Sequence, residues 1–130
     1  MEKRGKKNHM NVLVAEKDAV CGSRIEGLIQ QWGYNVDCAH SEQEILNLAR
    51  KKRVDIVLLE TSLPHEKLSE LIKELKEIDP EIRIVTMTPA NSGDMEKNIR
   101  KLGIAYYMTK PFPDEELKSI LDHNAKETHK

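Results

Sequence analysis

The sequence predicts an α/β protein that has a five-stranded, parallel, doubly wound sheet with about five helices distributed over both faces. Two observations predict this class of fold. Short apolar runs alternate along the chain with longer stretches of helical periodicity, as is typical of βα units that feed a parallel sheet. The run Val54–Leu59 is almost continuously apolar and contains several β-branched residues. A strand of this composition is expected in the middle of a sheet, where helices cover both of its faces.

Five apolar runs are the expected strands. In chain order they are Asn11–Ala15, Asn35–Ala39, Asp55–Leu59, Ile82–Thr88 and Ala105–Met108. Connections between parallel strands are nearly always right-handed crossovers, so the helices between these runs are expected to cover the sheet on both sides. Ligands of such sheets bind beyond the carboxyl ends of the strands. We therefore expect functional residues where these runs end.

Apolar residues recur with helical spacing in the segments between the strands. The first stripe ends at Gly33 and consists of Cys21, Ile25, Leu28, Ile29 and Trp32. Ser41 and Glu44 have the spacing of a capping box, which predicts the start of the second helix. The other stripes are Ile45, Leu48 and Ala49; Leu68, Leu71, Ile72 and Leu75; Met95, Ile99 and Leu102; and Leu117, Ile120 and Leu121. Each stripe is expected to pack its helix against the sheet.

The composition of the 130 residues fits one soluble globular domain. Hydrophobic residues make up 38% and charged residues 33%, with a formal net charge of -1, which argues against a disordered or membrane-embedded chain. No apolar stretch that could serve as a signal peptide or membrane span follows the basic N-terminus, so a cytoplasmic protein without a membrane partner is expected. We expect a flexible basic arm over residues 1–9, one domain over 10–123 and a tail over 124–130.

Several other kinds of site are not expected from this sequence. Cys21 and Cys38 have neither CxxC nor Cys/His ligand spacing, so they are predicted to be reduced, partly buried thiols. The five histidines are too scattered for a metal site. No aromatic or helix-turn-helix pattern accompanies the basic arm, so no nucleic-acid partner is expected.

Polar or charged residues stand at the ends of four expected strands. They are Glu16, Lys17 and Asp18 after the first, Glu60 after the third, Thr88 at the end of the fourth, and Thr109, Lys110 and Pro111 after the fifth. Over roughly residues 10 to 123, this ordered set resembles the receiver domain of bacterial response regulators. The segment Val57–Pro64 is similar to the segment around the phosphorylated aspartate of that family. Single pieces such as Lys-Pro-Phe are weak signals, whereas the ordered set is a strong one.

The resemblance implies a flavodoxin-like strand order, 2-1-3-4-5, and a phosphorylated aspartate beside a Mg²⁺ site. Glu60 stands at the position of the phosphoacceptor, and the acidic-pocket positions are held by Glu16, Lys17 and Asp18. Acyl phosphate formation needs a closely placed carboxylate oxygen, and Glu60 carries one methylene too many. Lys17 puts a cation where the family has an acidic Mg²⁺ ligand. We therefore expect Mg²⁺ binding to be weak or absent and phosphorylation to fail.

The remaining matched positions are Thr88, Tyr107, Lys110 and Pro111. The resemblance implies that Thr88 and Lys110 contact the phosphate, that Tyr107 changes rotamer on activation, and that the bond before Pro111 is cis. Each of these residues also has a purely structural interpretation. Thr88 favours strands, Tyr107 suits an amphipathic edge strand, and Lys110-Pro111 suits a turn that ends the strand.

The simplest picture of the pocket is a cluster of salt bridges. The Lys17 ammonium is expected to take the place of the metal and to pair with Glu60. Glu16 is a further possible partner of the Lys17 ammonium. Lys110 approaches Glu60 from the far strand. We expect Glu60 to face Lys17 or Lys110 and not Thr88, because charge attraction outweighs a neutral hydrogen bond. Tyr107 is then expected to point outward.

The preferred interpretation is a receiver-like signalling module of a two-component phosphorelay pathway that is not an enzyme and acts by binding proteins. The expected partner is a histidine kinase, another regulator or an output domain. The resemblance suggests the fourth helix, fifth strand and fifth helix as the contact surface, and as the interface of a homodimer. Opposite charges on these two helices suit reciprocal pairing across a two-fold axis. The charged residues are Lys97, Arg100 and Lys101, and Asp114, Glu115 and Glu116.

Two alternatives remain open. The first is a phosphorylatable response regulator that uses an atypical acceptor or metal site. The second is an unrelated flavodoxin-like binding protein or enzyme. Against the second, the sequence has no glycine-rich phosphate loop after the first strand, and no Ser/His/Asp or Cys/His nucleophile arrangement.

Overall fold

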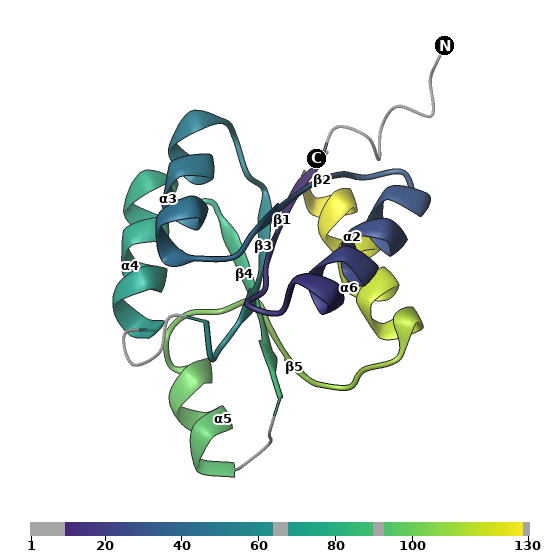
Figure 1. Cartoon of the computed structure of the whole chain (residues 1–130). Helices are drawn as coiled ribbons and strands as arrows, with labels where there is room; N and C mark the ends of the chain where they lie inside the picture. The colour runs from purple at the N-terminus through teal and green to yellow at the C-terminus, as the bar shows by residue number, and fades with distance from the viewer. Residues whose placement is uncertain (1–9, 64–67, 90–92, 129–130) are drawn as a thin grey trace.

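The computed structural model describes residues 10–63, 68–89 and 93–128 and contains a five-stranded parallel sheet (Figure 1). The strands are β1 (Asn11–Ala15), β2 (Asn35–Ala39), β3 (Ile56–Glu60), β4 (Arg83–Thr88) and β5 (Tyr106–Thr109). Their order is β2-β1-β3-β4-β5, which confirms the predicted topology. The expected basic arm, residues 1–9, lies outside the described residues.

Five helices connect and follow the strands in the described part of the chain. They are α2 (Ala19–Gln31), α3 (Glu42–Lys51), α4 (Leu68–Ile78), α5 (Gly93–Arg100) and α6 (Asp114–Thr128). Figure 1 shows α2 and α6 on one face of the sheet and α3, α4 and α5 on the other. Helix α6 continues to Thr128, so residues 124–128 extend the last helix where the sequence predicts a tail. Among the described helices, none has the length and apolar character needed to cross a membrane.

The sheet separates two apolar clusters. Val14 and Ile25 belong to the cluster between the sheet and the pair α2 and α6. Leu13 and Leu75 belong to the cluster on the opposite face, beneath α3 and α4. All residues of β3 are buried, as predicted for a central strand that is covered on both sides. This placement leaves the ends of the strands as the positions where polar side chains gather.

Polar side chains begin α2 and α3. The Asp18 carboxylate accepts hydrogen bonds from the backbone N–H groups of Val20 at 2.9 Å and Cys21 at 3.3 Å. Ser41 Oγ accepts a hydrogen bond from the backbone N–H of Glu44 at 3.2 Å, so the predicted start of α3 is confirmed. These caps satisfy N–H groups that have no partner inside the first turn of a helix.

Helix α5 packs against the sheet over part of its predicted apolar stripe. Ile99 is 6% exposed and Leu102 packs against the cluster beneath α3 and α4, but Met95 is 40% exposed. The expectation that Met95 packs against the sheet is therefore wrong. Figure 1 shows that the first turn of α5 extends past the ends of the strands, so no sheet lies beneath it.

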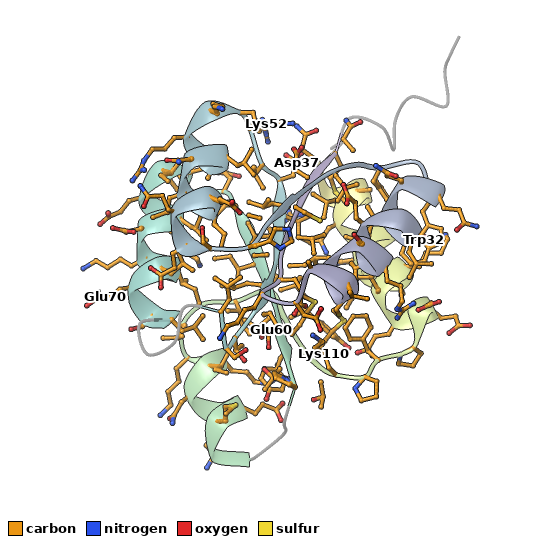
Figure 2. The ribbon with its side chains drawn as sticks, viewed as in Figure 1. Trp32, Asp37, Lys52, Glu60, Glu70 and Lys110 are labelled. Carbon is orange, nitrogen blue, oxygen red and sulfur yellow. The ribbon has the colours of Figure 1, made fainter. Side chains whose placement is uncertain are left out.

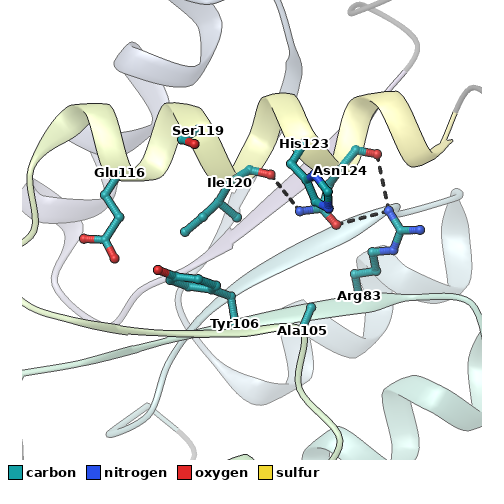
Figure 3. Close-up of a pocket in the computed structure, with 8 residues that line it drawn as sticks. All are labelled: Arg83, Ala105, Tyr106, Glu116, Ser119, Ile120, His123 and Asn124. Carbon is teal, nitrogen blue, oxygen red and sulfur yellow. Dashed lines mark hydrogen bonds between the residues drawn. The ribbon is translucent and has the colours of Figure 1, made fainter.

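Hydrogen bonds attach the second half of α6 to the start of β4. Arg83 Nη1 donates to the backbone oxygen of Asn124 at 3.3 Å and to its Oδ1 at 3.1 Å (Figure 3). Asn124 Nδ2 in turn donates to the backbone oxygen of Ile120 at 2.7 Å. An open hollow of ≈ 570 Å³ lies beside these residues, between β5 and α6. The network fixes α6 on the sheet and gives this hollow a defined wall.

Candidate functional site

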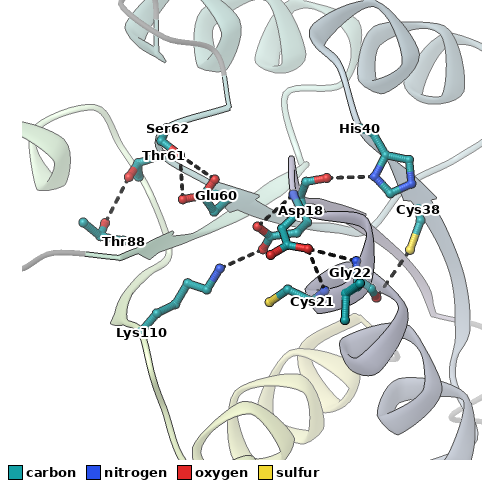
Figure 4. Close-up of polar contacts among 12 residues, drawn as sticks. Asp18, Cys21, Gly22, Cys38, His40, Glu60, Thr61, Ser62, Thr88 and Lys110 are labelled. Carbon is teal, nitrogen blue, oxygen red and sulfur yellow. Dashed lines mark hydrogen bonds and ion pairs between the residues drawn. The ribbon is translucent and has the colours of Figure 1, made fainter.

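Side chains from four strand ends meet beyond the carboxyl edge of the sheet. Glu16 follows β1, Glu60 ends β3, Thr88 ends β4 and Lys110 follows β5. Figure 2 shows Glu60 and Lys110 at the same end of the sheet, and Figure 4 shows the contacts around them. The carboxyl ends of neighbouring parallel strands lie along one edge, where ligands bind in sheets of this type. The structure thus brings together four of the residues that the sequence singles out.

The Glu60 carboxylate is buried and is bound by its own loop. Glu60 is 3% exposed. Ser62 Oγ lies 2.6 Å from Oε1 and 2.8 Å from Oε2 of Glu60 (Figure 4). A hydroxyl group has a single proton, so Ser62 donates to one of these oxygens at a time. The carboxylate is therefore held by the residue two positions after it.

Lys110 forms an ion pair with Glu16. Glu16 is 2% exposed, and its Oε1 lies 3.0 Å from Lys110 Nζ. Burial alone would lower the pKa of Lys110. Its hydrogen bond to Glu16 and the charge of that carboxylate, with smaller contributions from Cys21 and Glu60, raise the pKa above its ordinary value. Lys110 is therefore a charged side chain that binds Glu16 across the pocket from Glu60.

The position of Glu16 is fixed by close neighbours. Its Oε2 accepts a hydrogen bond from the backbone N–H of Asp18 at 3.5 Å, and its backbone oxygen lies 2.8 Å from His40 Nδ1. Gly22 packs against its side chain, and a Cβ at Gly22 would lie 3.4 Å from Glu16 Cβ. A Cβ at this distance would be in ordinary van der Waals contact, so Gly22 lies directly against the Glu16 side chain.

Lys17 lies outside the pocket. Its side chain is exposed in the loop between β1 and α2. The prediction that Lys17 pairs with Glu60 is wrong, because Ser62 binds Glu60. Lys110 lies near enough to Glu60 for the charge of that carboxylate to raise its pKa, as predicted, but it forms its ion pair with Glu16. An exposed ammonium group keeps its hydration, whereas a buried one loses it and needs a partner that offsets the loss. Lys110 already places one cation among the two acids, so a second buried cation is not required.

The residues at the acidic-pocket positions do not form the Mg²⁺ site that the resemblance implies. Lys110 occupies Oε1 of Glu16, and the carboxylate of Asp18 caps α2. Mg²⁺ requires several oxygen ligands in near-octahedral geometry. In the part of the chain that the structure describes, no group of three or more His, Cys, Asp or Glu side chains could hold a metal ion. The residues present therefore do not fit this ion.

Thr88 and Tyr107 are both buried. Thr88 Oγ1 accepts a hydrogen bond from Thr61 Oγ1 at 3.4 Å. Tyr107 is 6% exposed, and the guanidinium carbon of Arg100 lies 5.4 Å from the centroid of its ring. The prediction that Tyr107 points outward is therefore wrong. Burial of the aromatic ring and the cation above it both stabilise the inward position.

Two other details agree with the predictions. The peptide bond between Lys110 and Pro111 is cis. Cys21 and Cys38 are free thiols of intermediate exposure. Burial first, and then the charge of Glu16, raise the pKa of the Cys21 thiol above its ordinary value, although Lys110 acts in the opposite direction. Cys21 therefore stays protonated beside the ion pair.

The sequence pattern missed Thr61, Ser62 and Cys21 as members of the site. A serine placed two residues after a strand-end acid can turn back and bind it, because Ser side chains often form local hydrogen bonds. That spacing is present in Glu60-Thr61-Ser62 and could have indicated the contact. The position of Cys21 beside Lys110 depends on how α2 packs, and no local spacing indicates it.

Two buried acids, a threonine and a lysine at the carboxyl edge of a 2-1-3-4-5 sheet define a domain of the receiver class used in two-component signalling. Comparison with known families gives the same result. Residues 12–122 match the response regulator receiver domain, and the chain belongs to this family.

Relatives of known sequence cover this chain almost completely. The transcriptional regulatory protein ZraR of Escherichia coli (strain K12) is 27% identical over 122 residues, which are 94% of this chain and 28% of that protein. The sporulation initiation phosphotransferase F of Bacillus subtilis is 31% identical over 114 residues, which are 86% of this chain and 92% of that protein. The chain thus spans about a quarter of the length of ZraR and nearly all of the shorter relative.

Solved structures show the same fold. A two-component response regulator from Clostridium difficile superposes with a TM-score of 0.85 at 21% identity and covers 93% of this chain and 99% of its own. A response regulator from Burkholderia pseudomallei, with a phosphorylated aspartic acid, calcium ion and citrate, gives a TM-score of 0.78 at 27% identity. That likeness covers 92% of this chain and 71% of the Burkholderia chain.

Proposed function

We propose that this receiver domain is a cytoplasmic signalling module of a two-component pathway that is not phosphorylated and acts by binding a protein partner. One observation carries the proposal. The buried carboxylate at the acceptor position belongs to Glu60 and is bound by Ser62, while Lys110 is paired with Glu16. Each group that would take part in phosphoryl transfer already has an internal partner.

The geometry of phosphoryl transfer explains why these contacts matter. The attacking oxygen must be placed in line with the leaving group, and small displacements reduce the rate by orders of magnitude. Glu60 is one methylene longer than aspartate, and both of its oxygens lie against Ser62 Oγ. Lys110 would have to leave Glu16 before it could stabilise charge on a phosphoryl group. Both changes oppose formation of an acyl phosphate.

The proposed contact surface is formed by α5, β5 and α6, with a second copy of the chain as the partner in a homodimer. Tyr106 on β5 is 42% exposed and contributes aromatic surface. Exposed basic side chains lie on α5, and acidic side chains lie in the first turn of α6. Two copies related by a two-fold axis would place these opposite charges against each other. A histidine kinase, another regulator or an output domain is the alternative partner for the same surface.

The function is tested by incubating the protein with a small phosphodonor and millimolar Mg²⁺, and measuring the intact mass and the melting temperature. The expected result is an unmodified mass and no rise in melting temperature at constant ionic strength, because a ligand of the folded state must stabilise it. A phosphorylated mass, or stabilisation by Mg²⁺, would support a phosphorylatable regulator with an atypical site. Sedimentation of the same sample distinguishes a homodimer from a monomer that needs another partner.

A further inference from the structure

We propose that a pocket between α2 and the loop before α6 binds a small carboxylate with an apolar body, such as an aromatic acid. The pocket has a volume of ≈ 300 Å³, at the lower end of the range for small-molecule sites in proteins. Lys110 and Cys21 line it, and Figure 4 shows these two side chains at the edge of the candidate site. The proposal does not rest on the proposed function.

Apolar side chains form most of the wall of this pocket. Ile25 of α2 is 1% exposed, and Phe112 packs against the apolar cluster between the sheet and the pair α2 and α6. Pro89 and Pro111 add two exposed rings to the wall, and proline has no backbone N–H group. Burial of apolar surface is favourable, so the wall favours an apolar group of a ligand over a polar one.

The charged side chains that line the pocket, among the described residues, are both cations. They are Arg24 of α2 and Lys110 after β5. Lys110 Nζ lies 3.0 Å from Glu16 Oε1, and Arg24 Nη1 lies 3.6 Å from Asp114 Oδ1. Neither of these two acids is among the described residues that line the pocket. A bound ligand would therefore contact the cations and not their acidic partners.

Both cations have N–H groups for a further acceptor. An ammonium group has three N–H donors and a guanidinium group has five, and a guanidinium group binds a carboxylate with two parallel hydrogen bonds. Among the described residues, Lys110 donates to Glu16, and Arg24 pairs with Asp114. The side chains of Arg24 and Asp114 are 59% and 47% exposed, so this pair is weak and a ligand carboxylate can replace Asp114.

The combination of wall and charge selects the class of ligand. A neutral apolar molecule would fill the wall but would leave the two cations without a new partner. A small inorganic anion would bind the cations but would leave the apolar wall hydrated. A cationic ligand would be repelled by Arg24 and Lys110. A carboxylate with an apolar body satisfies both parts of the pocket.

The first test is an NMR titration of the protein with 3-phenylpropionate. We expect saturable shifts at Cys21 and Phe112, with a Kd on the order of 1 mM for a ligand of this size. The neutral 3-phenylpropanamide and the short acid acetate should both bind more weakly. Arg24→Gln should weaken binding of 3-phenylpropionate about three- to tenfold. Arg50→Gln is the matched control, because it removes an exposed arginine from α3, on the opposite face of the sheet, and should leave the Kd unchanged.

The two thiols provide a second measurement in the same protein. Cys21 lines the pocket, whereas Cys38 is not among the described residues that line it, and both thiols have intermediate exposure. Saturating 3-phenylpropionate should slow alkylation of Cys21 by a maleimide and leave the rate at Cys38 unchanged. Mass spectrometry of the digested protein measures both rates.

Three results would overturn the inference. One is the absence of saturable binding of 3-phenylpropionate, and another is equal affinity for this acid and its amide. The third is an equal loss of affinity in Arg24→Gln and Arg50→Gln, or equal protection of both thiols, since either would place the ligand outside this pocket. None of these results depends on whether the protein accepts a phosphoryl group.

Discussion

The Glu60 carboxylate shows how single residues decide the state of the site. It is buried, and the neighbouring hydroxyl group of Ser62 binds it in place of a cation. A buried carboxylate needs donors, since an ion in a low-dielectric environment is otherwise strongly destabilised. The short loop that follows β3 supplies this donor locally, and Lys110 is then available to bind Glu16.

Removal of the Ser62 hydroxyl group should therefore weaken the fold. Ser62→Ala should lower the free energy of unfolding by about 1 to 2 kcal/mol, because it takes a charge-assisted donor from a buried acid. Urea denaturation measures the change. Ser62→Thr keeps the hydroxyl group and should recover most of the loss, and Ser69→Ala removes an exposed hydroxyl group elsewhere as a control. The interpretation fails if Ser62→Ala is as stable as the unmodified protein.

At this scale the sequence predicts which residues meet but not how they pair. The convergence of Glu16, Glu60 and Lys110 follows from strand order, which is encoded in the pattern of apolar runs. The choice of partner for each charge depends on desolvation and on side-chain reach. Both depend on displacements of about 1 Å, and the spacing of residues along the sequence does not indicate displacements of that size. For this reason Lys17, which has the correct charge to bind the acids, remains exposed.

At the scale of helices and strands, capping residues and the ends of apolar runs indicate where most elements begin and end. The first two strands begin and end where the apolar pattern places them, and α3 begins after Ser41 as its spacing predicts. Gly33 follows α2 with φ of 94°, a conformation in which glycine is favoured. Met95 was wrongly expected to be buried because helical periodicity predicts which side of a helix is apolar. It does not predict how far the sheet extends beneath that side.

Asp18 belongs to this scale because it acts as a cap. Asp18→Ala should lower the free energy of unfolding by about 1 kcal/mol, since it leaves the N–H groups of Val20 and Cys21 without their acceptor. Asp18→Asn keeps an acceptor and should be nearly as stable as the unmodified protein. Chemical denaturation of both variants, with and without Mg²⁺, measures these effects. A loss of stability that appeared only in Mg²⁺ would mean that Asp18 is a metal ligand.

For the whole molecule, several buried or partly buried groups couple stability to alkaline pH. Burial first, and then the hydrogen bond to Glu26, raise the pKa of Cys38 from 9.0 to about 12. Burial and the hydrogen bond to Asp122 raise the pKa of Tyr34, and the contacts with Glu16 raise that of Lys110 against the effect of burial. Each of these groups keeps its proton to higher pH in the folded protein than in the unfolded chain.

The sign of the pH dependence follows from these shifts. Their contribution to stability is fully present below the ordinary pKa of each group and is lost as the pH rises through the folded pKa. The free energy of unfolding should therefore fall between about pH 9 and pH 12 for Cys38. Cys38→Ala should have a shallower fall over this range, measured by urea denaturation under reducing conditions. An unchanged slope would mean that the thiol titrates equally in both states.

For the whole molecule, we propose that two departures from the family pattern, at Glu60 and Lys17, block phosphorylation of this receiver domain. Glu60 places the acceptor carboxylate against Ser62, and Lys17 lacks the carboxylate that a Mg²⁺ site needs. The domain keeps Thr88 and Lys110 at the strand ends. Restoration of both acids should therefore restore the chemistry, whereas restoration of one should not.

The most direct test is the intact mass of three proteins after incubation with a small phosphodonor and Mg²⁺. We predict no phosphorylated species for the unmodified chain, little for Glu60→Asp, and a substantial fraction for Glu60→Asp combined with Lys17→Asp. Equal phosphorylation of the single and double variants, or phosphorylation of the unmodified chain, would contradict the account.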